Sequence, residues 1–197
     1  MQDRLITFLS KHKLKLVKKI SKGHSSEVFL VKNSRGKKLA LKIEKDKSRR
    51  FGMAVKEANY LKLANTFGVG PKLFAFDFDC KCILMEFVDG APFDKWFFEK
   101  EPTKKALKKF IENLLEQAKE LDKVGISHGQ LAGKGRNILV RNNLPVIIDF
   151  EKASIVRRAR NENQIKSFLF DNPKSSIAKK IKKFWSLLDK FSVDFQN

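Results

Sequence analysis

The amphipathic pattern of residues 107–121 divides this chain of 197 residues into two unlike halves. Its apolar residues recur at the i, i+3, i+4 and i+7 spacing of a long helix. They are Leu107, Phe110, Ile111, Leu114, Leu115, Ala118 and Leu121, and Gly125 stands where such a helix ends. Mostly short strands are predicted before this helix, and mostly helices after it. This order favours an α+β fold with two unlike lobes.

Strands are predicted where short apolar runs are bounded by turn residues, at 14–20, 27–33, 38–44, 72–79 and 82–88. Further helices are predicted at 2–12, at 50–64 and, near the C-terminus, from about Ser175 to Phe191. Residues 89–96 are expected to form a connector. Two short strands, 137–140 and 145–149, are expected after the long helix, and one more helix after Ala153.

The formal charge of +20 at pH 7 is the strongest feature of the composition. A field of this sign attracts polyanions, so nucleotides and RNA or a ribonucleoprotein are candidate partners. A solvated, lysine-rich surface explains the charge equally well. The last predicted helix leaves the same two interpretations open, because it carries Lys179, Lys180, Lys182 and Lys183 beside its apolar face.

Apolar residues make up 42% of the chain and five residues are proline, which favours a folded protein. The longest apolar runs, such as "ILMEFV", fall far short of the roughly 20 residues that cross a membrane, so no membrane partner is expected. Cys80 and Cys82 are separated by one residue. We expect them to be reduced thiols in a cytoplasmic protein.

Several positions carry groups suited to binding phosphate and metal. The loop "SKGHSS" would let backbone N–H groups approach a phosphate closely at Gly23. Lys42 is the only charged residue in the apolar segment "LALKI", and Glu57 of the next predicted helix is placed to pair with it. Asp149 ends an apolar run and Asn137 begins one. Their oxygens are therefore candidate ligands for Mg²⁺.

Each of these residues also has an ordinary interpretation. A single glycine in a hairpin is most often a turn, and a strand lysine usually faces water. Asn137 also suits a turn and Asp149 a helix cap. His128 is expected to be a structural histidine bonded to the backbone. The order of these features along the chain is more informative than any one of them.

In this order the motifs resemble those of the protein-kinase superfamily, across residues 14–152. "ISKGHSSEV" is similar to the glycine-rich loop with only its central glycine kept, and "LALK" to the strand-three lysine motif. "ILMEFVDG" resembles the hinge, "SHGQLAGKGRNILV" the catalytic loop and "IIDFEKA" the Asp-Phe-Gly segment. The chain is most similar to atypical kinases: the RIO and Bud32 types, bacterial lipopolysaccharide-sugar kinases and, above all, small archaeal kinase-like proteins.

The resemblance implies one kinase-like domain over residues 1–197. Its N-lobe, at about 14–88, would contain a five-stranded antiparallel sheet, and its C-lobe, at about 89–197, would be reduced and mainly helical. ATP would bind between the lobes to Ile20, Ser21, Gly23, Ser25, Ser26, Val28, Ala40, Lys42, Glu57, Met85, Glu86 and Val88. Mg²⁺ would bind to Asn137 and Asp149.

The catalytic loop departs from the family pattern. Gln130 replaces the catalytic aspartate, and a neutral amide orients a hydroxyl or a water but holds no proton at pH 7. Gln130 and Asn137 are seven residues apart, where the usual pattern has about five. The extra length contains Lys134 and Arg136. These cations either reach the transferring phosphate or stay in water.

Glu151 replaces the glycine of the Asp-Phe-Gly segment. If the strand continues through this segment, Asp149 and Glu151 point the same way, because strand side chains alternate between faces. A second carboxylate near the metal would then act as a ligand or as a substitute base. The other interpretation of Glu151 is a surface residue in an ion pair.

The expected function is that of an ATP-binding, Mg-dependent atypical Ser/Thr-type protein kinase or ATPase, with Lys42, Gln130, Lys134 and Asp149 as catalytic residues. Without a general base, which contributes roughly 10²–10⁴-fold, it is expected to be slow. The alternative is a pseudokinase, a nucleotide-gated scaffold on an RNA-containing assembly. A third hypothesis is a nucleic-acid-binding protein that uses the fold without nucleotide. The acceptor stays open between a protein, the chain itself and a small molecule.

Overall fold

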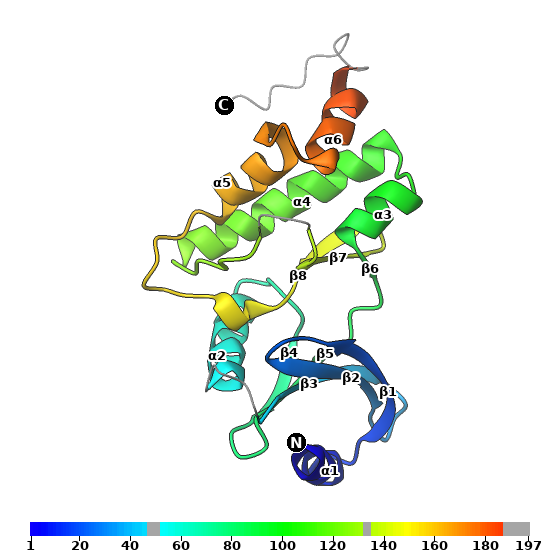
Figure 1. Cartoon of the computed structure of the whole chain (residues 1–197), viewed down its shortest axis with the longest axis vertical. Coiled ribbons are helices and arrows are strands. Elements are labelled where there is room, and N and C mark those ends of the chain that lie inside the picture. Colours follow the sequence, from blue (N-terminus) through cyan, green and yellow to red (C-terminus); the bar gives the residue numbers. More distant parts are fainter. Residues whose placement is uncertain (47–51, 132–134, 187–197) are drawn as a thin grey trace.

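The computed structural model describes residues 1–46, 52–131 and 135–186 (Figure 1). The first half of the chain forms a five-stranded antiparallel sheet with the strand order β1-β2-β3-β5-β4. Its strands are β1 (Lys15–Lys22), β2 (Ser26–Lys32), β3 (Lys38–Glu44), β4 (Leu73–Asp77) and β5 (Cys82–Glu86). The predicted antiparallel sheet of the N-lobe is therefore confirmed.

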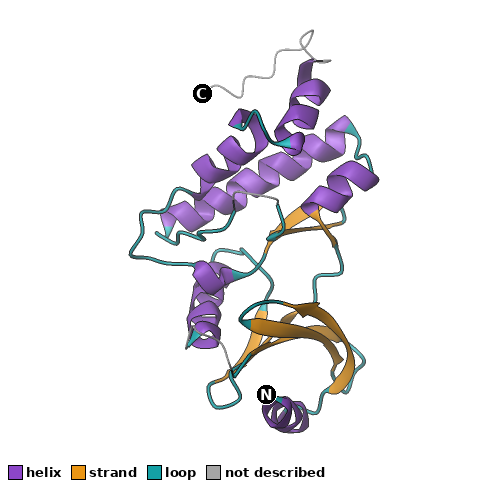
Figure 2. Ribbon diagram, viewed as in Figure 1, coloured by secondary structure: helices purple, strands orange, loops and turns teal. Residues whose placement is uncertain are grey.

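Two helices cover opposite faces of this sheet (Figure 2). Helix α1 (Gln2–Lys11) buries Phe8 in a cluster with Leu41 and Ile43 of β3. Helix α2 (Met53–Asn65) packs Ala54 and Ala58 against Ile83 of β5, on the other face. Because strand side chains alternate, the residue between Leu41 and Ile43 must point toward α2. That residue is Lys42.

The second half of the chain is mainly helical, as predicted. Its longest element is α4 (Lys104–Lys123), which buries all seven of the apolar residues that predicted it. Thr103 caps its first turn by accepting a hydrogen bond from the backbone N–H of Ala106. Gly125 follows its end with a φ of 73°, a conformation that favours glycine. Helices α5 (Asn161–Lys166) and α6 (Ser176–Ser186) follow, with a π-helical turn, η2 (Ser167–Asp171), between them.

A small sheet packs against α4 in the C-lobe and consists of β6 (Ala91–Pro92), β7 (Ile138–Arg141) and β8 (Leu144–Ile147). The prediction of a connector over 89–96 was wrong in part, because α3 (Phe93–Glu99) begins within it. Phe93 and Phe97 are completely buried, and with Trp96 they form one apolar face at i, i+3 and i+4 spacing. Packing of these rings stabilises a helix too short to be obvious from its sequence.

The predicted strand over 145–149 ends two residues early. Asp149 has a φ of 68° and precedes a single 3₁₀ turn, η1 (Phe150–Lys152). Phe150 is buried against the core, so the chain must turn where the apolar run suggests that it continues. The expectation that a continuing strand aligns Asp149 with Glu151 was therefore wrong.

Helix α6 packs on the C-lobe through Ile177 and Ile181, which are both buried. Lys179 and Lys182 are exposed to water, whereas the ammonium of Lys180 donates to the backbone carbonyl of Phe97 at 3.0 Å. The predicted end of this helix, at 187–191, lies outside the described residues. Within the ranges described, no helix has the length and apolar character to cross a membrane.

Candidate active site

A cleft of about 1080 Å³ lies between the two lobes. Residues from the β1–β2 loop, β3, α2, the β5 end, the loop after α4 and the segment after β8 all line it. It brings together the predicted site residues Ile20, Ser21, Gly23, Ser25, Ser26, Val28, Ala40, Lys42, Glu57, Met85, Glu86, Val88, Gln130, Asn137 and Asp149. Lys134 lies outside the described residues.

Lys42 occupies the centre of the cleft and is buried. Its Nζ lies 2.6 Å from Oε2 of Glu57 and 2.8 Å from Oδ1 of Asp149. Burial lowers the pKa of Lys42, but the two carboxylates outweigh it and leave this pKa raised overall. The lysine is therefore a fixed ammonium that joins the N-lobe to the C-lobe. The pairing with Glu57 that chain order suggested is present.

Glu57 is almost completely enclosed under the sheet. Burial raises its pKa, and the negative charges of Asp149 and Glu151 act in the same direction, whereas Lys42 opposes them. Oxygen atoms of Glu57, Asp149 and Glu151 all lie within 4.8 Å of one another. The ammonium of Lys42 relieves the repulsion between Glu57 and Asp149.

The β1–β2 loop reaches over the cleft toward this cluster. The Ser25 hydroxyl donates to Oε2 of Glu151 at 2.7 Å. Within the loop, the Gly23 N–H donates to the carbonyl of Ser26 at 2.9 Å, and the ammonium of Lys45 donates to the carbonyl of Gly23. Glu151 thus lies near Asp149 as expected, although the 3₁₀ turn places it there and no strand does so.

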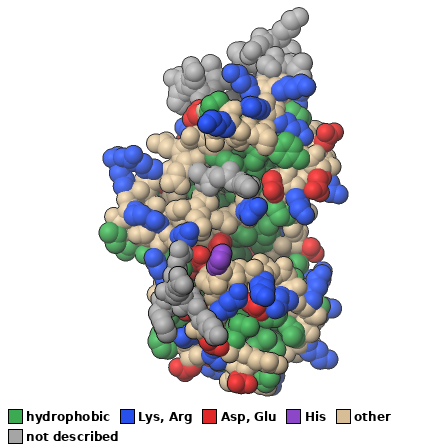
Figure 3. Space-filling view, viewed as in Figure 1, with side chains coloured by type: hydrophobic (Ala, Val, Ile, Leu, Met, Phe, Trp, Pro, Cys, Tyr) green, Lys and Arg blue, Asp and Glu red, His purple; other side chains and the backbone are tan. Residues whose placement is uncertain are grey.

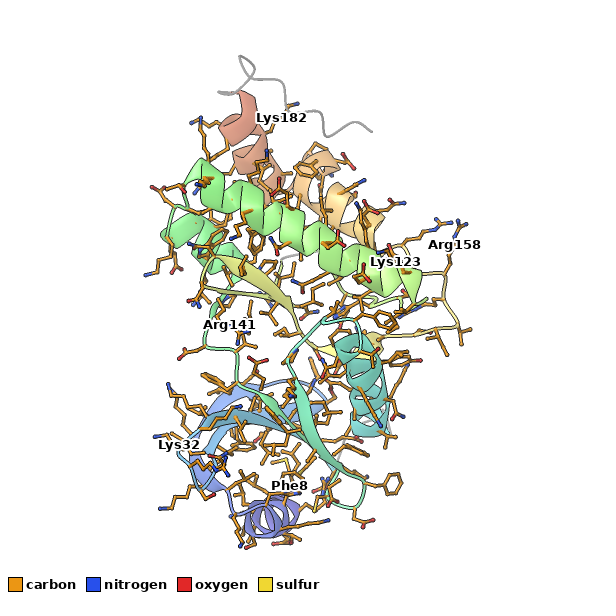
Figure 4. The ribbon with its side chains drawn as sticks, turned by 180° about the vertical axis from the view of Figure 1, so that it is seen from behind. Phe8, Lys32, Lys123, Arg141, Arg158 and Lys182 are labelled. Atoms are coloured by element: carbon orange, nitrogen blue, oxygen red, sulfur yellow. The ribbon has the colours of Figure 1, made fainter. Side chains whose placement is uncertain are left out.

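The other wall of the cleft contains the end of β5 and the residues after it. Met85, Glu86 and Val88 line the cleft, and all three belong to the segment that resembles a kinase hinge. The carboxylate of Glu86 accepts a hydrogen bond from Arg141 of β7, which lies between the two lobes in Figure 4. A charged pair therefore crosses from one lobe to the other beside the chain connection.

His128 does not point into the cleft. Its side chain is completely buried, and its Nε2 lies 3.0 Å from the carbonyl oxygen of Ile148. Its backbone N–H donates to Oδ1 of Asn161 at 2.9 Å. Burial lowers the pKa of His128 to about 4, so the ring is neutral at pH 7. The prediction of a structural, backbone-bonded histidine is confirmed.

Gln130 and Asn137 lie close together on the floor of the cleft. The amide Nδ2 of Asn137 donates to the backbone carbonyl of Gln130 at 3.2 Å. The side-chain Oε1 of Gln130 is buried and has no hydrogen-bond partner among the described residues. A buried acceptor without a partner is costly, so this oxygen is available to a ligand group that donates a hydrogen bond.

The RIO-domain family model matches residues 19–169, which is most of the chain. The chain belongs to the RIO family. This RIO-family protein thus has the protein-kinase-like fold of an atypical kinase. Uncharacterized protein MJ1211 of Methanocaldococcus jannaschii is 34% identical to it over 98 residues, which cover 50% of this chain and 80% of that protein.

Among solved structures, the RIO-family chain resembles the Rio2 kinase of Chaetomium thermophilum, described as an ADP/Mg²⁺-phosphoaspartate complex. The TM-score is 0.64 at 20% identity, over 98% of this chain and 62% of that one. At this identity the likeness concerns the fold. This chain spans about three fifths of the length of that Rio2 chain.

Sequence reasoning missed several residues that line the cleft of this RIO-family protein. They are His24, Pro71, Pro92, Leu139, Ile148 and Lys152. Most of them lie beside predicted residues in the sequence, so their proximity to a motif could have indicated that they line the cleft. Pro71 is different, because only the packing of the loop after α2 places it in the cleft. Arg136, which was considered as a phosphate contact, also lines the cleft.

Proposed function

We propose that this RIO-family protein binds ATP with Mg²⁺ in the cleft and acts as an atypical Ser/Thr-type kinase or ATPase. The observation that carries this proposal is the position of Lys42. Its ammonium lies between carboxylates of both lobes, inside a cleft that also contains the glycine-containing loop. A rigidly held cation inside such a cleft suits a polyphosphate. The Rio2 complex with ADP and Mg²⁺ supports the same choice of ligand.

The residues present fit a nucleotide. Ile20, Val28, Ala40 and Met85 give the cleft an apolar section suited to a base. Backbone groups from Glu86 to Val88 are candidates for hydrogen bonds to the base edge. The loop around Gly23, with Ser21, Ser25 and Ser26, would cover the phosphates, and Lys42 would pair with them.

Mg²⁺ also fits the donor set, because it prefers carboxylate and amide oxygens together with phosphate oxygens. Asp149 and Asn137 are the proposed ligands, and Glu151 lies close enough to Asp149 to join them. When bound, the ion would neutralise charge on the phosphates. Asp149 would then contact the ion as well as Lys42, which fixes the relative position of the two lobes.

Phosphoryl transfer depends mostly on positioning and charge stabilisation, so the loss of the catalytic aspartate predicts a slow enzyme. Gln130 would orient the acceptor hydroxyl or water through its free Oε1. Arg136, which lines the cleft, would stabilise developing negative charge. The acceptor is a hydroxyl of a protein, of this chain or of a small molecule, or a water molecule in the ATPase case.

Thermal unfolding with and without Mg·ATP tests this proposal. Ligand at about 100 times its Kd adds about 2.7 kcal/mol to the free energy of unfolding. We expect stabilisation of the wild type and a much smaller effect for Lys42→Met and Asp149→Asn. Phosphate release and autophosphorylation are then measured for the same proteins. If Mg·ATP stabilises none of them, the proposed function is wrong.

A second candidate function is that of a pseudokinase, a nucleotide-gated scaffold. Its partners would be RNA or a ribonucleoprotein. Gln130 in place of the catalytic aspartate favours it, as does the charge of +20. Lys and Arg side chains are spread over the visible face and do not gather in one patch (Figure 3). Stabilisation by Mg·ATP with turnover no higher than that of Asp149→Asn would favour this scaffold.

A further inference from the structure

A second groove, of about 840 Å³, lies on the N-lobe between α2 and β4. We call it the α2–β4 groove and define it by Asn59 and Lys62 of α2, Lys72, Phe74 and Phe76 at β4, and Glu86. Helix α2 and strand β4 lie side by side when the molecule is seen from behind (Figure 4). Apart from Glu86, which also lines the cleft, the proposed function makes no use of these residues.

One wall of the groove is an open sheet edge. Strand β4 is the last strand of the sheet and, among the residues that the structure describes, pairs only with β5. Ala75 and Asp77 lie opposite Leu84 and Cys82, and the Glu86 N–H donates to the Lys72 carbonyl.

On its other side β5 bonds to β3, as the hydrogen bond from Glu44 N–H to the Lys81 carbonyl shows. Alternate residues of an antiparallel strand bond to opposite sides. The even-numbered residues of β5 therefore bond to β4, through Ala75 and Asp77. The backbone N–H and C=O of Phe76 therefore point away from β5, toward the edge of the sheet.

The rim of the groove is cationic. The side chains of Lys62 and Lys72 are exposed, and neither forms an ion pair within the part of the chain that the structure describes. The ammonium of Lys37 lies 4.9 Å from the ring centroid of Phe74, and that of Lys72 lies 6.0 Å from it. Among the described residues that line the groove, Glu86 alone carries a carboxylate, and it is already paired with Arg141.

The rim also leaves apolar surface in water. The Phe74 side chain is 40% exposed, and the Phe76 ring is half-buried beside it. An exposed edge strand with apolar side chains is a site where a further strand adds. Unpaired lysines around it select a negatively charged strand, because the charges become complementary on binding.

We propose that the α2–β4 groove binds an extended acidic segment of a partner protein, which adds to the sheet along the free edge of β4. Main-chain hydrogen bonds to Phe76 would hold the segment. Its apolar side chains would pack on Phe74 and Phe76, and its carboxylates would pair with Lys62 and Lys72. An edge strand favours a peptide over nucleic acid, because only a peptide supplies a matching row of N–H and C=O groups.

The probe for this proposal is a short fluorescein-labelled peptide in which Asp alternates with Ile. Its binding to the full chain is followed by fluorescence anisotropy, without nucleotide, so that a failure here leaves the proposed function untouched. The comparison peptide has Lys in place of Asp. We expect the Asp peptide to bind at least about tenfold more tightly than the Lys peptide. Equal binding of the two peptides overturns the proposal.

Two variants locate the binding site. Lys62→Glu with Lys72→Glu reverses the charge of the rim, and Asn59→Trp places a large ring across the groove from an exposed position of α2. Each variant is expected to lower the affinity for the Asp peptide about tenfold. The matched control is Lys104→Glu with Lys105→Glu, an equal change of charge at exposed positions of α4, and it should retain wild-type affinity. If the control weakens binding as much as the rim variant, the interaction is unspecific and the proposal is wrong.

Hydrogen exchange provides a second measurement, because unspecific adsorption of the peptide to the surface would not change the exchange rates of β4 amides. Addition of the Asp peptide should slow exchange of the β4 amides, at Phe76 above all. A short oligouridine is tested in parallel, because lysines beside an aromatic ring also suit single-stranded RNA. The peptide proposal fails if oligouridine displaces the peptide, if the same variants weaken the binding of oligouridine, and if the peptide leaves exchange of the β4 amides unchanged. The groove would then be a nucleic-acid site.

Discussion

The Ser25 hydroxyl donates to the carboxylate of Glu151 at 2.7 Å, and this hydrogen bond holds the β1–β2 loop against the turn that follows β8. The two residues are 126 positions apart and belong to different lobes. Their contact closes one side of the cleft. It also restrains Glu151, which lies beside Asp149 in the acidic cluster.

Loss of this contact is expected to loosen the loop. In Ser25→Ala, amide exchange over Gly23–Ser26 should become faster, because the loop loses its side-chain bond to the C-lobe. The free energy of unfolding should fall by only about 1 kcal/mol, since the bond is partly exposed. Hydrogen-exchange mass spectrometry measures the first effect and urea unfolding the second. Ser34→Ala, on the exposed β2–β3 turn, is the control, and identical exchange in both variants would contradict this role of Ser25.

Removal of the Lys42 ammonium is expected to cost stability in a pH-dependent way. In Lys42→Met the buried carboxyl of Glu57 loses its counter-ion, so its pKa rises further above its unfolded value of about 4.3. The unfolded chain then releases this proton first as the pH rises. Because the pKa of Glu57 is already raised to about 7 in the wild type, the variant should lose stability relative to the wild type only as the pH rises above about 7.

At the alkaline end of the range that the fold tolerates, the loss should approach about 3 kcal/mol, typical of a buried pair that loses one partner. Urea unfolding across this pH range measures it. The double variant Lys42→Met with Glu57→Gln provides the control, because it has no buried carboxyl at this position to ionise. A pH dependence that persists in the double variant would assign the effect to another group.

His128 is expected to make the fold sensitive to acid. Burial lowers its pKa to about 4, against about 6.5 in the unfolded chain. The stability that the neutral ring contributes is complete above about pH 6.5 and is lost as the pH falls toward 4, because the unfolded state gains the proton first. The difference between the folded and unfolded pKa values of His128 corresponds to about 3 kcal/mol in the free energy of unfolding.

Comparison of the wild type with His128→Gln isolates this contribution, because Gln keeps an N–H donor for the Ile148 carbonyl but does not titrate. The difference between the two free energies of unfolding, measured by urea at several pH values, should shrink as the pH falls from about 6.5 to 4. A constant difference would show that His128 does not titrate over this range.

Gly129 is expected to tolerate no side chain. Its φ is 80°, and a Cβ there would lie 2.5 Å from the guanidinium of Arg157 and 3.0 Å from the Lys152 carbonyl. Gly125 has a similar φ of 73°, but nothing lies within 4 Å of its Cβ position. Gly125→Ala therefore reports backbone strain alone, of about 1 kcal/mol. Gly129→Ala should cost at least about 1 kcal/mol more, measured by urea unfolding, and equal costs would show that Arg157 moves away freely.

The N-lobe was predictable from sequence because each of its elements has a local signal. Alternating apolar residues between Gly- and Asn-containing turns indicated the hairpins, and every predicted strand of the large sheet is present. Lys42 shows where local reasoning reaches its limit. A strand lysine usually faces water, and only its order before Glu57 suggested a pair. Burial of that pair depends on α2 covering the same face of the sheet.

The segment after β8 could not be predicted in this way. The run "PVIID" has the composition of a strand, but Asp149 adopts a left-handed conformation that a short polar side chain tolerates. The cause is tertiary, because Phe150 turns inward to the core. Helix α3 did carry a local signal, in the spacing of Phe93, Trp96 and Phe97, but its brevity obscured it. Packing, and not propensity, sets both features.

Gln130 is the residue where a single change should alter turnover without altering the fold. Gln130 lines the cleft, its buried Oε1 has no hydrogen-bond partner in the described ranges, and its backbone carbonyl accepts from the amide of Asn137. Gln130→Glu has nearly the same shape and supplies the carboxylate that the catalytic loop lacks. If the proposed function is correct, phosphate release or autophosphorylation with Mg·ATP should rise by up to roughly 10²-fold. Thermal stabilisation by Mg·ATP should stay near that of the wild type.

The pH profile of this variant separates a base from a structural effect. Activity that depends on the new carboxylate should fall as the pH drops and Glu is protonated, whereas the wild type, with a neutral amide, lacks this limb. Gln130→Ala is the control, because it removes the orienting oxygen and should lower any wild-type turnover. If turnover rises in Gln130→Glu but does not fall at low pH, the gain does not come from the new carboxylate acting as a base. No rise at all would show that the lengthened loop directs this side chain away from the acceptor, so that phosphoryl transfer here relies on Lys42, the metal and positioning alone.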